Sequence, residues 1–291
     1  MGYIARAQLA AAVSQAGGLG IIETSSGQLD EVKAEIEKMA DLTDRPWGVN
    51  IAQLFVGDDA DIVEFVVDQG VDFVTTSAGD PALLVPRLKD AGITVFHVVP
   101  TLRGAAKAIA AGVDGLVVEG IEGGGFKNPA GASTMVLLPL VAQSYDVPIV
   151  AAGGICDGPS LAAALALGAD GAQLGTAMLS ASESPVHENW KQAVVAAAET
   201  DTLLLNRSGR PGFRVLSSEH SRALDDADTV AMPGLESMMD LYFGGDMEAA
   251  FAFSGQVAGR IDRVAPVAEI LESAWNDCVA ILRDLGERAS S

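Results

Sequence analysis

The stretch Ala111-Gly-Val-Asp-Gly-Leu-Val-Val-Glu119 contains the unit from which the fold is predicted. Gly112 follows a segment with helical spacing, and glycine readily takes the left-handed conformation that ends a helix. The run 115–119 is apolar on both faces, which is typical of a strand buried in a parallel sheet. The same order of helix end, glycine and strand recurs at 69–72, 91–93 and 167–170. The chain is therefore predicted to repeat one βα unit.

Working outward from this unit, seven short apolar runs fit buried strands: 21–23, 47–51, 73–76, 94–99, 115–119, 148–151 and 171–174. Segments with helical spacing lie before or between them, at 6–16, 29–39, 59–69, 81–91, 102–111, 134–143 and 160–167. Such a series can form an open doubly wound sheet or a (β/α)8 barrel. Glycine-rich segments follow several different strands, which favours a barrel with one site surrounded by loops. Only residues 1–5 precede the first helix, so we expect the first barrel strand to be absent.

The second part of the chain shows a different pattern. Helical spacing is found at 186–200, 235–242, 246–253 and 264–285, and a polar stretch at 207–229 reads as a loop. We therefore predict a barrel domain over residues 1–184 and a helical lid or subdomain over residues 185–291.

Composition excludes several classes of protein. The 291 residues carry 18 Lys and Arg against 39 Asp and Glu, a net charge of −21. Such a surface repels nucleic acid and anionic membranes. Apolar runs are too short to span a bilayer, and the N-terminus lacks a signal-peptide pattern. Cys156 and Cys278 show no paired or zinc-binding spacing, so we expect reduced thiols and a cytoplasmic protein.

Two glycine motifs follow consecutive predicted strands near the end of the barrel segment. The first is Pro148-Ile-Val-Ala-Ala-Gly-Gly-Ile-Cys-Asp-Gly158, and the second is Gly171-Ala-Gln-Leu-Gly-Thr-Ala177. Glycines at such turns let backbone N–H groups approach a phosphate, and a following helix N-terminus favours the negative charge. Barrel enzymes often bind phosphate after strands seven and eight. We therefore predict a phosphate site here, the alternative being tight turns around a packed core.

A third glycine-rich loop follows the predicted strand 115–119. It reads Val117-Val-Glu-Gly-Ile-Glu-Gly-Gly-Gly-Phe-Lys-Asn-Pro129, with little side-chain bulk between two acids and a lysine. The loop could lie flat against a ring system, or it could be a flexible surface loop. We favour the first interpretation because this loop and the phosphate motifs follow strands at the same end of the barrel.

The order of these motifs resembles the nitronate monooxygenase family, formerly called 2-nitropropane dioxygenases. The resemblance rests on Met1-Gly2, Ala16-Gly-Gly-Leu-Gly-Ile-Ile22, Trp47-Gly-Val-Asn50, the 119–125 loop, Ala151-Ala-Gly-Gly-Ile155 and the 171–176 motif, and it spans nearly the whole chain. It implies FMN bound in a (β/α)8 barrel. By resemblance, the FMN phosphate would contact Gly153, Gly154, Gly175 and Thr176. The ribityl chain or ring would meet Met1, Gly2, Asn50, Glu119, Gly123, Gly124 and Gln173.

The chain departs from the family at the proton-transferring residue. The family's loop commonly ends in Gly-Gly-His, whereas this chain has Phe126 followed by Lys127. Phenylalanine cannot transfer a proton, so Phe126 is assigned only to the substrate pocket. Lys127 could replace the histidine, or it could attract an anionic substrate or offset negative charge on the reduced flavin.

Few other side chains qualify for the site. His97 lies two residues before the end of a predicted strand and is a second catalytic candidate, although a lone histidine there is also typical of a packed core. Ser77 follows another strand and could line the substrate pocket. No His or Cys spacing predicts a metal site.

The predicted function is FMN-dependent oxidation of a small nitronate-like or carbanionic substrate, with O2 as acceptor. A first alternative is a flavin reductase or dehydrogenase of an enoyl or acyl thioester, with NAD(P)H as partner. A second alternative is a barrel that binds FMN or another phosphate without catalysis. The sequence does not indicate an oligomeric state.

Overall fold

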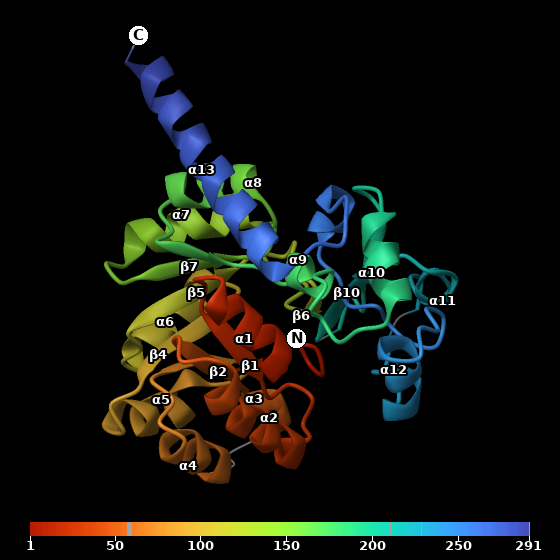
Figure 1. Cartoon of the computed structure of the whole chain (residues 1–291), viewed down its shortest axis with the longest axis horizontal. Helices are drawn as coiled ribbons and strands as arrows, with labels where there is room; N and C mark the ends of the chain where they lie inside the picture. The colour runs from red at the N-terminus through yellow and green to blue at the C-terminus, as the bar shows by residue number, and fades with distance from the viewer. Residues whose placement is uncertain (57–59, 210, 228, 291) are drawn as a thin grey trace.

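The computed structural model describes residues 1–56, 60–209, 211–227 and 229–290. Its centre is a curved sheet of parallel strands in the order β1-β2-β3-β4-β5-β7-β8 (Figure 1). The strands are β1 Gly20–Glu23, β2 Trp47–Ala52, β3 Phe73–Ser77, β4 Thr94–Val99, β5 Gly115–Glu119, β7 Ile149–Ala152 and β8 Gly171–Gln173. The predicted strands are confirmed, each to within about one residue at its ends.

Helices lie between the strands on the outside of the sheet, as predicted. They are α1 Ala7–Gln15, α2 Leu29–Leu42, α3 Gln53–Val56, α4 Ala60–Asp68, α5 Pro81–Asp90, α6 Leu102–Ala110, α7 Thr134–Ser144, α8 Gly158–Ala166 and α9 Thr176–Leu179. The predicted start of α4, Asp59, lies outside the described residues. Capping sets these boundaries: Asp80 accepts a hydrogen bond from the Ala82 N–H at the start of α5, and Gly92 has φ +81° just after its end.

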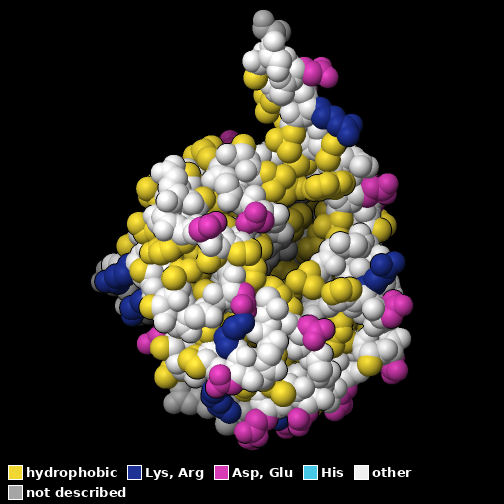
Figure 2. All heavy atoms as spheres, turned by 90° about the vertical axis from the view of Figure 1, so that its left-hand side faces the viewer, with side chains coloured by type: hydrophobic (Ala, Val, Ile, Leu, Met, Phe, Trp, Pro, Cys, Tyr) yellow, Lys and Arg dark blue, Asp and Glu magenta, His cyan; other side chains and the backbone are white. Residues whose placement is uncertain are grey.

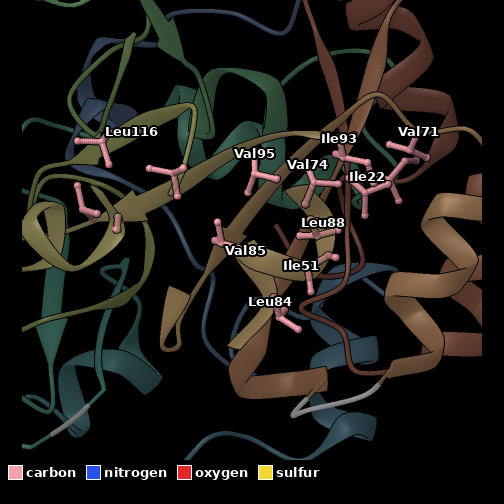
Figure 3. Packing of buried hydrophobic residues seen from close by; sticks show 14 of the residues in the cluster. Ile22, Ile51, Val71, Val74, Leu84, Val85, Leu88, Ile93, Val95 and Leu116 are labelled. Atoms are coloured by element: carbon pink, nitrogen blue, oxygen red, sulfur yellow. The ribbon is translucent and has the colours of Figure 1, made fainter. Parts of the chain in front are cut away.

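The main core lies between the sheet and these helices. Figure 3 shows Ile22, Val74 and Val95 from the strands packing near Leu84 and Leu88 from α5. Strand side chains alternate between two faces, so every second residue enters this core and the residues between them face the inside of the curved sheet. This alternation decides which strand residues can reach a ligand inside the sheet.

Strands β1 and β8 are the two ends of the sheet. Across the described parts of the chain, no strand pairs with the outer edge of either, so hydrogen bonds do not close the expected eight-stranded ring. On the outside, α13 (Val267–Ala289) packs against both α1 and α8. Helix α13 thus connects the helices that flank the two ends of the sheet.

Gly158, at the start of α8, permits this packing. A Cβ added there would lie 2.3 Å from the Asp277 Cβ and 2.8 Å from the Cys278 nitrogen in α13. We expect Gly158→Ala to lower the unfolding free energy by about 1–3 kcal/mol, because α13 must move away. Gly286→Ala, in the outer part of α13 where nothing lies within 4 Å, is the matched control. It should raise stability by about 0.5–1 kcal/mol through helix propensity. Urea unfolding of both variants checks this, and equal effects would contradict it.

The second part of the chain contains a small sheet that was not predicted. Strands β6 (Gly125–Lys127), β9 (Thr202–Leu205) and β10 (Gly212–Leu216) form an antiparallel sheet in the order β6-β10-β9. The other elements are α10 Glu188–Val195, α11 Glu219–Ala223, α12 Leu235–Tyr242 and the 3₁₀ helix η1 Gln256–Arg260. One β ladder therefore joins the glycine loop to the region beyond residue 184.

Two predicted features of this region are wrong. Residues 246–253, predicted as a helix, contain no helix, because Phe251 and Phe253 pack against Phe213 of the small sheet and Phe253 forms an isolated bridge with Val215. The stretch 207–229, predicted as a loop, contains β10 and α11, although positions 210 and 228 lie outside the described residues.

Figure 2 shows the outer end of α13 standing clear of the rounded body and a hollow with apolar side chains in the face below it. Within the described ranges, no helix is both long and apolar enough to cross a membrane.

Candidate active site

An ion pair between a buried lysine and a partly exposed glutamate lies at the carboxyl end of β5. The Lys127 Nζ is 2.6 Å from the Glu119 Oε1, and the Lys127 side chain is only 4% exposed. A Cβ added to Gly123 would lie 2.9 Å from both of these atoms, so this glycine lets the loop backbone pass directly beside the pair. The structure therefore brings Glu119, Gly123 and Lys127 together, as the sequence indicated.

The turn after β7 lies against this loop. Gly153 and Gly154 have φ +81° and +82°, and a Cβ on Gly153 would be 2.9 Å from the Gly120 carbonyl oxygen. The Gly154 N–H donates to no acceptor in the described chain. The positive φ of both residues favours glycine at these positions. The turn leaves the Gly154 N–H available to donate a hydrogen bond to a ligand.

The turn after β8 completes this side of the site. A Cβ on Gly175 would have only the Met1 sulfur within 4 Å, at 3.9 Å, so the space beside it is open. The Thr176 Oγ1 accepts a hydrogen bond of 2.9 Å from the Gly255 N–H. The structure thus brings Met1 close to Gly175 and Thr176.

Gly255 belongs to the site and was missed from the sequence. A Cβ there would be 2.9 Å from the Glu122 carbonyl oxygen, 3.1 Å from the Gly124 nitrogen and 3.2 Å from the Thr176 Oγ1. It therefore links the glycine loop to the turn after β8. The available signal was the pair Gly255 and Gly259, which follows the segment wrongly predicted as a helix.

Three further side chains fix the glycine loop. The Glu122 carboxylate accepts from the Thr134 N–H at 3.0 Å, and the Thr134 Oγ1 donates to the Gly153 carbonyl oxygen at 2.7 Å. Buried Arg214 donates from Nε to the Ile121 carbonyl oxygen at 2.9 Å, and burial lowers the pKa of its guanidinium. No sequence signal distinguishes Arg214 or Thr134, because each acts through a partner distant in the chain.

The remaining predicted cofactor residues come from β2, from β8 and from the N-terminus. Asn50 faces the inside of the sheet and donates to the Thr75 Oγ1 at 2.9 Å and to the Ser77 Oγ at 3.3 Å. Gln173 is exposed at the end of β8. Gly2 packs against Ser25, whose Oγ would be 3.3 Å from an added Cβ. Asn50 and Ser77 are therefore a second polar group, at the ends of β2 and β3.

Phe126 points into an aromatic cluster. Its ring centroid lies 5.4 Å from that of Phe55, 5.4 Å from that of Phe213 and 5.8 Å from that of Phe253. Phe126 and Lys127 are neighbours in β6, so their side chains lie on opposite faces of the small sheet. The position that usually carries histidine therefore packs in a core between the barrel rim and the small sheet.

His97 lies on the outer face of β4 and does not face the inside of the sheet. His97 shares the face of β4 that carries Val95 and Val99, which belong to the main core. Phe96 and Val98 are on the opposite face and pack in a separate cluster inside the sheet. Its Nδ1 is 2.7 Å from the Thr76 Oγ1. Burial lowers the pKa of His97 to about 4, and Asp80 opposes this shift. His97 therefore occupies a packed position on the core side of β4.

The lowered pKa of His97 predicts a dependence of stability on pH. The unfolded chain binds a proton at this residue near pH 6.5, whereas the folded chain binds it only near pH 4. Stability is therefore lost as pH falls through this window, by about 3 kcal/mol in total. We expect His97→Gln to remove this part of the dependence, measured by urea unfolding at pH 7 and pH 4.5. An unchanged difference between the two pH values in the variant would contradict it.

Cys156 follows the glycine turn after β7. Burial, together with the neighbouring Asp157 carboxylate, raises the pKa of the Cys156 thiol to about 12. A nucleophilic role for Cys156 is therefore disfavoured.

Comparison with known proteins matches this arrangement to one family. The profile of the family described as Nitronate monooxygenase matches residues 1–62 and 52–277. The chain is 31% identical over 325 aligned positions to the nitronate monooxygenase of Pseudomonas aeruginosa, covering 91% of this chain and 90% of the relative.

Another curated relative carries a different name. The chain is 38% identical over 222 residues to the (3aS,4S,5R,7aS)-5-hydroxy-7a-methyl-1-oxo-octahydro-1H-indene-4-carboxyl-CoA dehydrogenase of Mycobacterium tuberculosis. This alignment covers 75% of the chain and 62% of that protein. For the protein of the same name from Rhodococcus jostii the identity is 35%, and 63% of its length is covered. The chain thus spans less than two thirds of these relatives.

Solved structures show the same fold over nearly the whole chain. FabK from Thermotoga maritima superposes with a TM-score of 0.91 at 33% identity, covering 99% of this chain and 93% of the other. The nitroalkane oxidase of Streptomyces ansochromogenes gives 0.83 at 27% identity, covering 97% and 94%.

Proposed function

Because the chain belongs to the nitronate monooxygenase family, we propose that it is an FMN-dependent oxidoreductase that oxidises a small carbanionic substrate such as a nitronate. The observation that supports this proposal is the buried Lys127 ammonium, which pairs with Glu119 beside Gly123, the glycine that lies against the turn after β7. A cation fixed at the carboxyl ends of parallel strands is well placed to bind an anionic substrate.

The residues present fit FMN. The Gly154 N–H lacks an acceptor in the described chain, and the space beside Gly175 is open except for the Met1 sulfur. These turns would hold the phosphate of FMN, together with the Thr176 hydroxyl. The side chain-free backbone at Gly123 and Gly124 would lie against its ring. When bound, FMN supplies a two-electron acceptor for the substrate carbon.

The chain's own residues then bind and orient the substrate. The Lys127 ammonium would hold the negatively charged oxygen of a nitronate, and Glu119 would keep the ammonium in place by its hydrogen bond of 2.6 Å. Phe126 cannot remove a proton. A substrate that is already ionised needs no base, so we expect nitronates to react better than neutral nitroalkanes. O2 is the proposed final acceptor.

A second candidate is oxidation or reduction of an acyl thioester, with NAD(P)H as a possible electron donor in the reductive direction. It is favoured by the name of the M. tuberculosis relative, a carboxyl-CoA dehydrogenase, and by the close superposition on FabK. In this reaction Lys127 would hold the thioester carbonyl oxygen. A barrel that binds FMN without catalysis is the remaining alternative.

An anaerobic absorbance experiment separates these candidates. The purified protein is supplied with FMN, and its visible spectrum is recorded before and after addition of propionate 3-nitronate, with NADPH and a hydroxyacyl-CoA in parallel cuvettes. Bleaching by the nitronate alone supports the first proposal. Bleaching by NADPH or by the acyl-CoA alone supports the second. Bound FMN that no reductant bleaches indicates a binding protein, and failure to bind FMN contradicts all three.

A further inference from the structure

Thr134, the first residue of α7, joins two parts of the site that are separate in the sequence. Its N–H lies 3.0 Å from both carboxylate oxygens of Glu122 in the glycine loop. Its Oγ1 lies 2.7 Å from the Gly153 carbonyl oxygen in the turn after β7. One residue thus contacts both the loop and the turn.

The hydroxyl proton of Thr134 has one best acceptor. The Oγ1 also lies 3.2 Å from the Glu122 Oε2 and 3.3 Å from the Ala152 carbonyl oxygen. A hydroxyl carries a single proton, and the Gly153 oxygen is the nearest of the three acceptors. The Glu122 carboxylate is already engaged by the Thr134 N–H. The hydroxyl therefore donates to Gly153.

This bond fixes the direction of a neighbouring donor. The Gly153 carbonyl and the Gly154 N–H belong to the same peptide unit, and in a planar trans peptide these two groups point in opposite directions. Thr134 holds the carbonyl toward α7, so the Gly154 N–H points away from Thr134. That N–H donates to no described residue, and a Cβ on Gly154 would meet nothing closer than 3.8 Å.

The turn contains two consecutive glycines, so a hydrogen bond from Thr134 is needed to hold it in one conformation. Two consecutive glycines can adopt many conformations, and ordering them costs more entropy than ordering other residues. The contact between Thr134 and the turn also requires a glycine at position 120. A Cβ on Gly120 would lie 2.1 Å from the Thr134 Oγ1 and 2.4 Å from the Thr134 nitrogen. Only glycine at position 120 lets Thr134 reach the turn.

We infer that Thr134 is a positioning residue whose hydroxyl aims the Gly154 N–H at the phosphate of the cofactor. The inference rests on the proposed function, because it takes the ligand of the turn to be FMN. It assigns to Thr134 a role in recognising the phosphate and none in contacting the ring.

Titrations with FMN and riboflavin test this role, because riboflavin lacks the phosphate. Binding is followed by the change in flavin fluorescence for the wild-type chain, Thr134→Val and Thr134→Ser. We expect Thr134→Val to weaken FMN binding about tenfold, as for one lost hydrogen bond to a charged group. Riboflavin binding should change less than about twofold, and Thr134→Ser should match the wild type, since it keeps the hydroxyl. Thr101→Val, which removes the capping hydroxyl of α6, is the control and should leave both affinities unchanged.

Several outcomes would overturn the inference. Equal FMN affinity in Thr134→Val and the wild type would do so while leaving the proposed function intact. Equal weakening of FMN and riboflavin would show a general structural role. A wild-type chain that binds FMN no better than riboflavin would contradict both the phosphate site and the inference. If Thr134→Val does not fold, the comparison of Thr134→Ala with Thr134→Ser gives the same test.

Discussion

Replacing Lys127 by methionine is expected to lower turnover of a nitronate about 1,000-fold while changing FMN affinity less than about threefold. The side chain is buried and pairs with Glu119, so methionine fills the space but removes the charge that would hold the substrate oxygen. Loss of one preorganised electrostatic contact in a buried site typically costs 10²–10³ in turnover.

The control for this experiment is a second buried lysine. Lys191 is 6% exposed and donates to the Ser182 carbonyl oxygen, and its ammonium forms no ion pair with Glu119. Lys191→Met should lower stability without changing the turnover of properly folded, FMN-loaded protein. Steady-state oxygen consumption and flavin fluorescence titration provide the two measurements. Turnover of Lys127→Met within about fivefold of the wild type would remove this lysine from the mechanism.

Replacing Gly153 by alanine is expected to weaken FMN binding about 100-fold. The added Cβ would lie 2.9 Å from the Gly120 oxygen and 3.1 Å from the Gly123 nitrogen, so the turn must shift away from the glycine loop. A shift that removes two hydrogen bonds to the phosphate accounts for an effect of this size.

Gly92→Ala is the control that distinguishes a displaced turn from backbone strain alone. Gly92 has the same φ of +81°, but a Cβ there would meet nothing within 4 Å. Both variants should lose about 1 kcal/mol of stability to the left-handed conformation. Only Gly153→Ala should lose FMN binding as well. If both variants bind FMN equally well, the turn after β7 does not hold the phosphate.

Local sequence patterns were enough to predict the parallel sheet. Each strand is a short apolar run bounded by turn residues, and helix ends such as Gly92 and Gly112 have the positive φ that the sequence implied. The apolar runs and the helix-ending glycines act within a few residues of the chain, and in the parallel sheet the tertiary contacts agree with these local preferences. The turns at Gly153 and Gly175 were found in the same way.

The small sheet could not be predicted because its order depends on distant partners. All of β10 is buried, so its side chains show no alternation of apolar and polar residues. Its neighbour β6 lies within the glycine loop and is only three residues long. The aromatic residues of 246–253 suited a helix face equally well, and only their contact with Phe213 excludes it.

The positions of some candidate site residues could be predicted from the sequence, and those of others could not. Glu119 and Lys127 are only eight residues apart and flank a glycine-rich loop, so the sequence alone indicated that they could lie together. Whether His97 faces the ligand or the core depends on which set of alternate residues points inward along β4. Thr134, Arg214 and Gly255 act through backbone groups, and a sequence does not show which backbone group a side chain will reach.

The long separation between partners at the glycine loop has a consequence for biosynthesis. Arg214 is 93 residues beyond Ile121, and Gly255 is 79 residues beyond Thr176. Ribosomes add about 5–20 residues per second, so the loop emerges on the order of 5–20 seconds before Arg214 is made. The parallel strands can pair while translation continues, but the contacts of the glycine loop with Arg214 and Gly255 form only when nearly the whole chain has been synthesised. FMN is therefore expected to bind at the end of synthesis, and nascent chains stalled before residue 214 should not retain it.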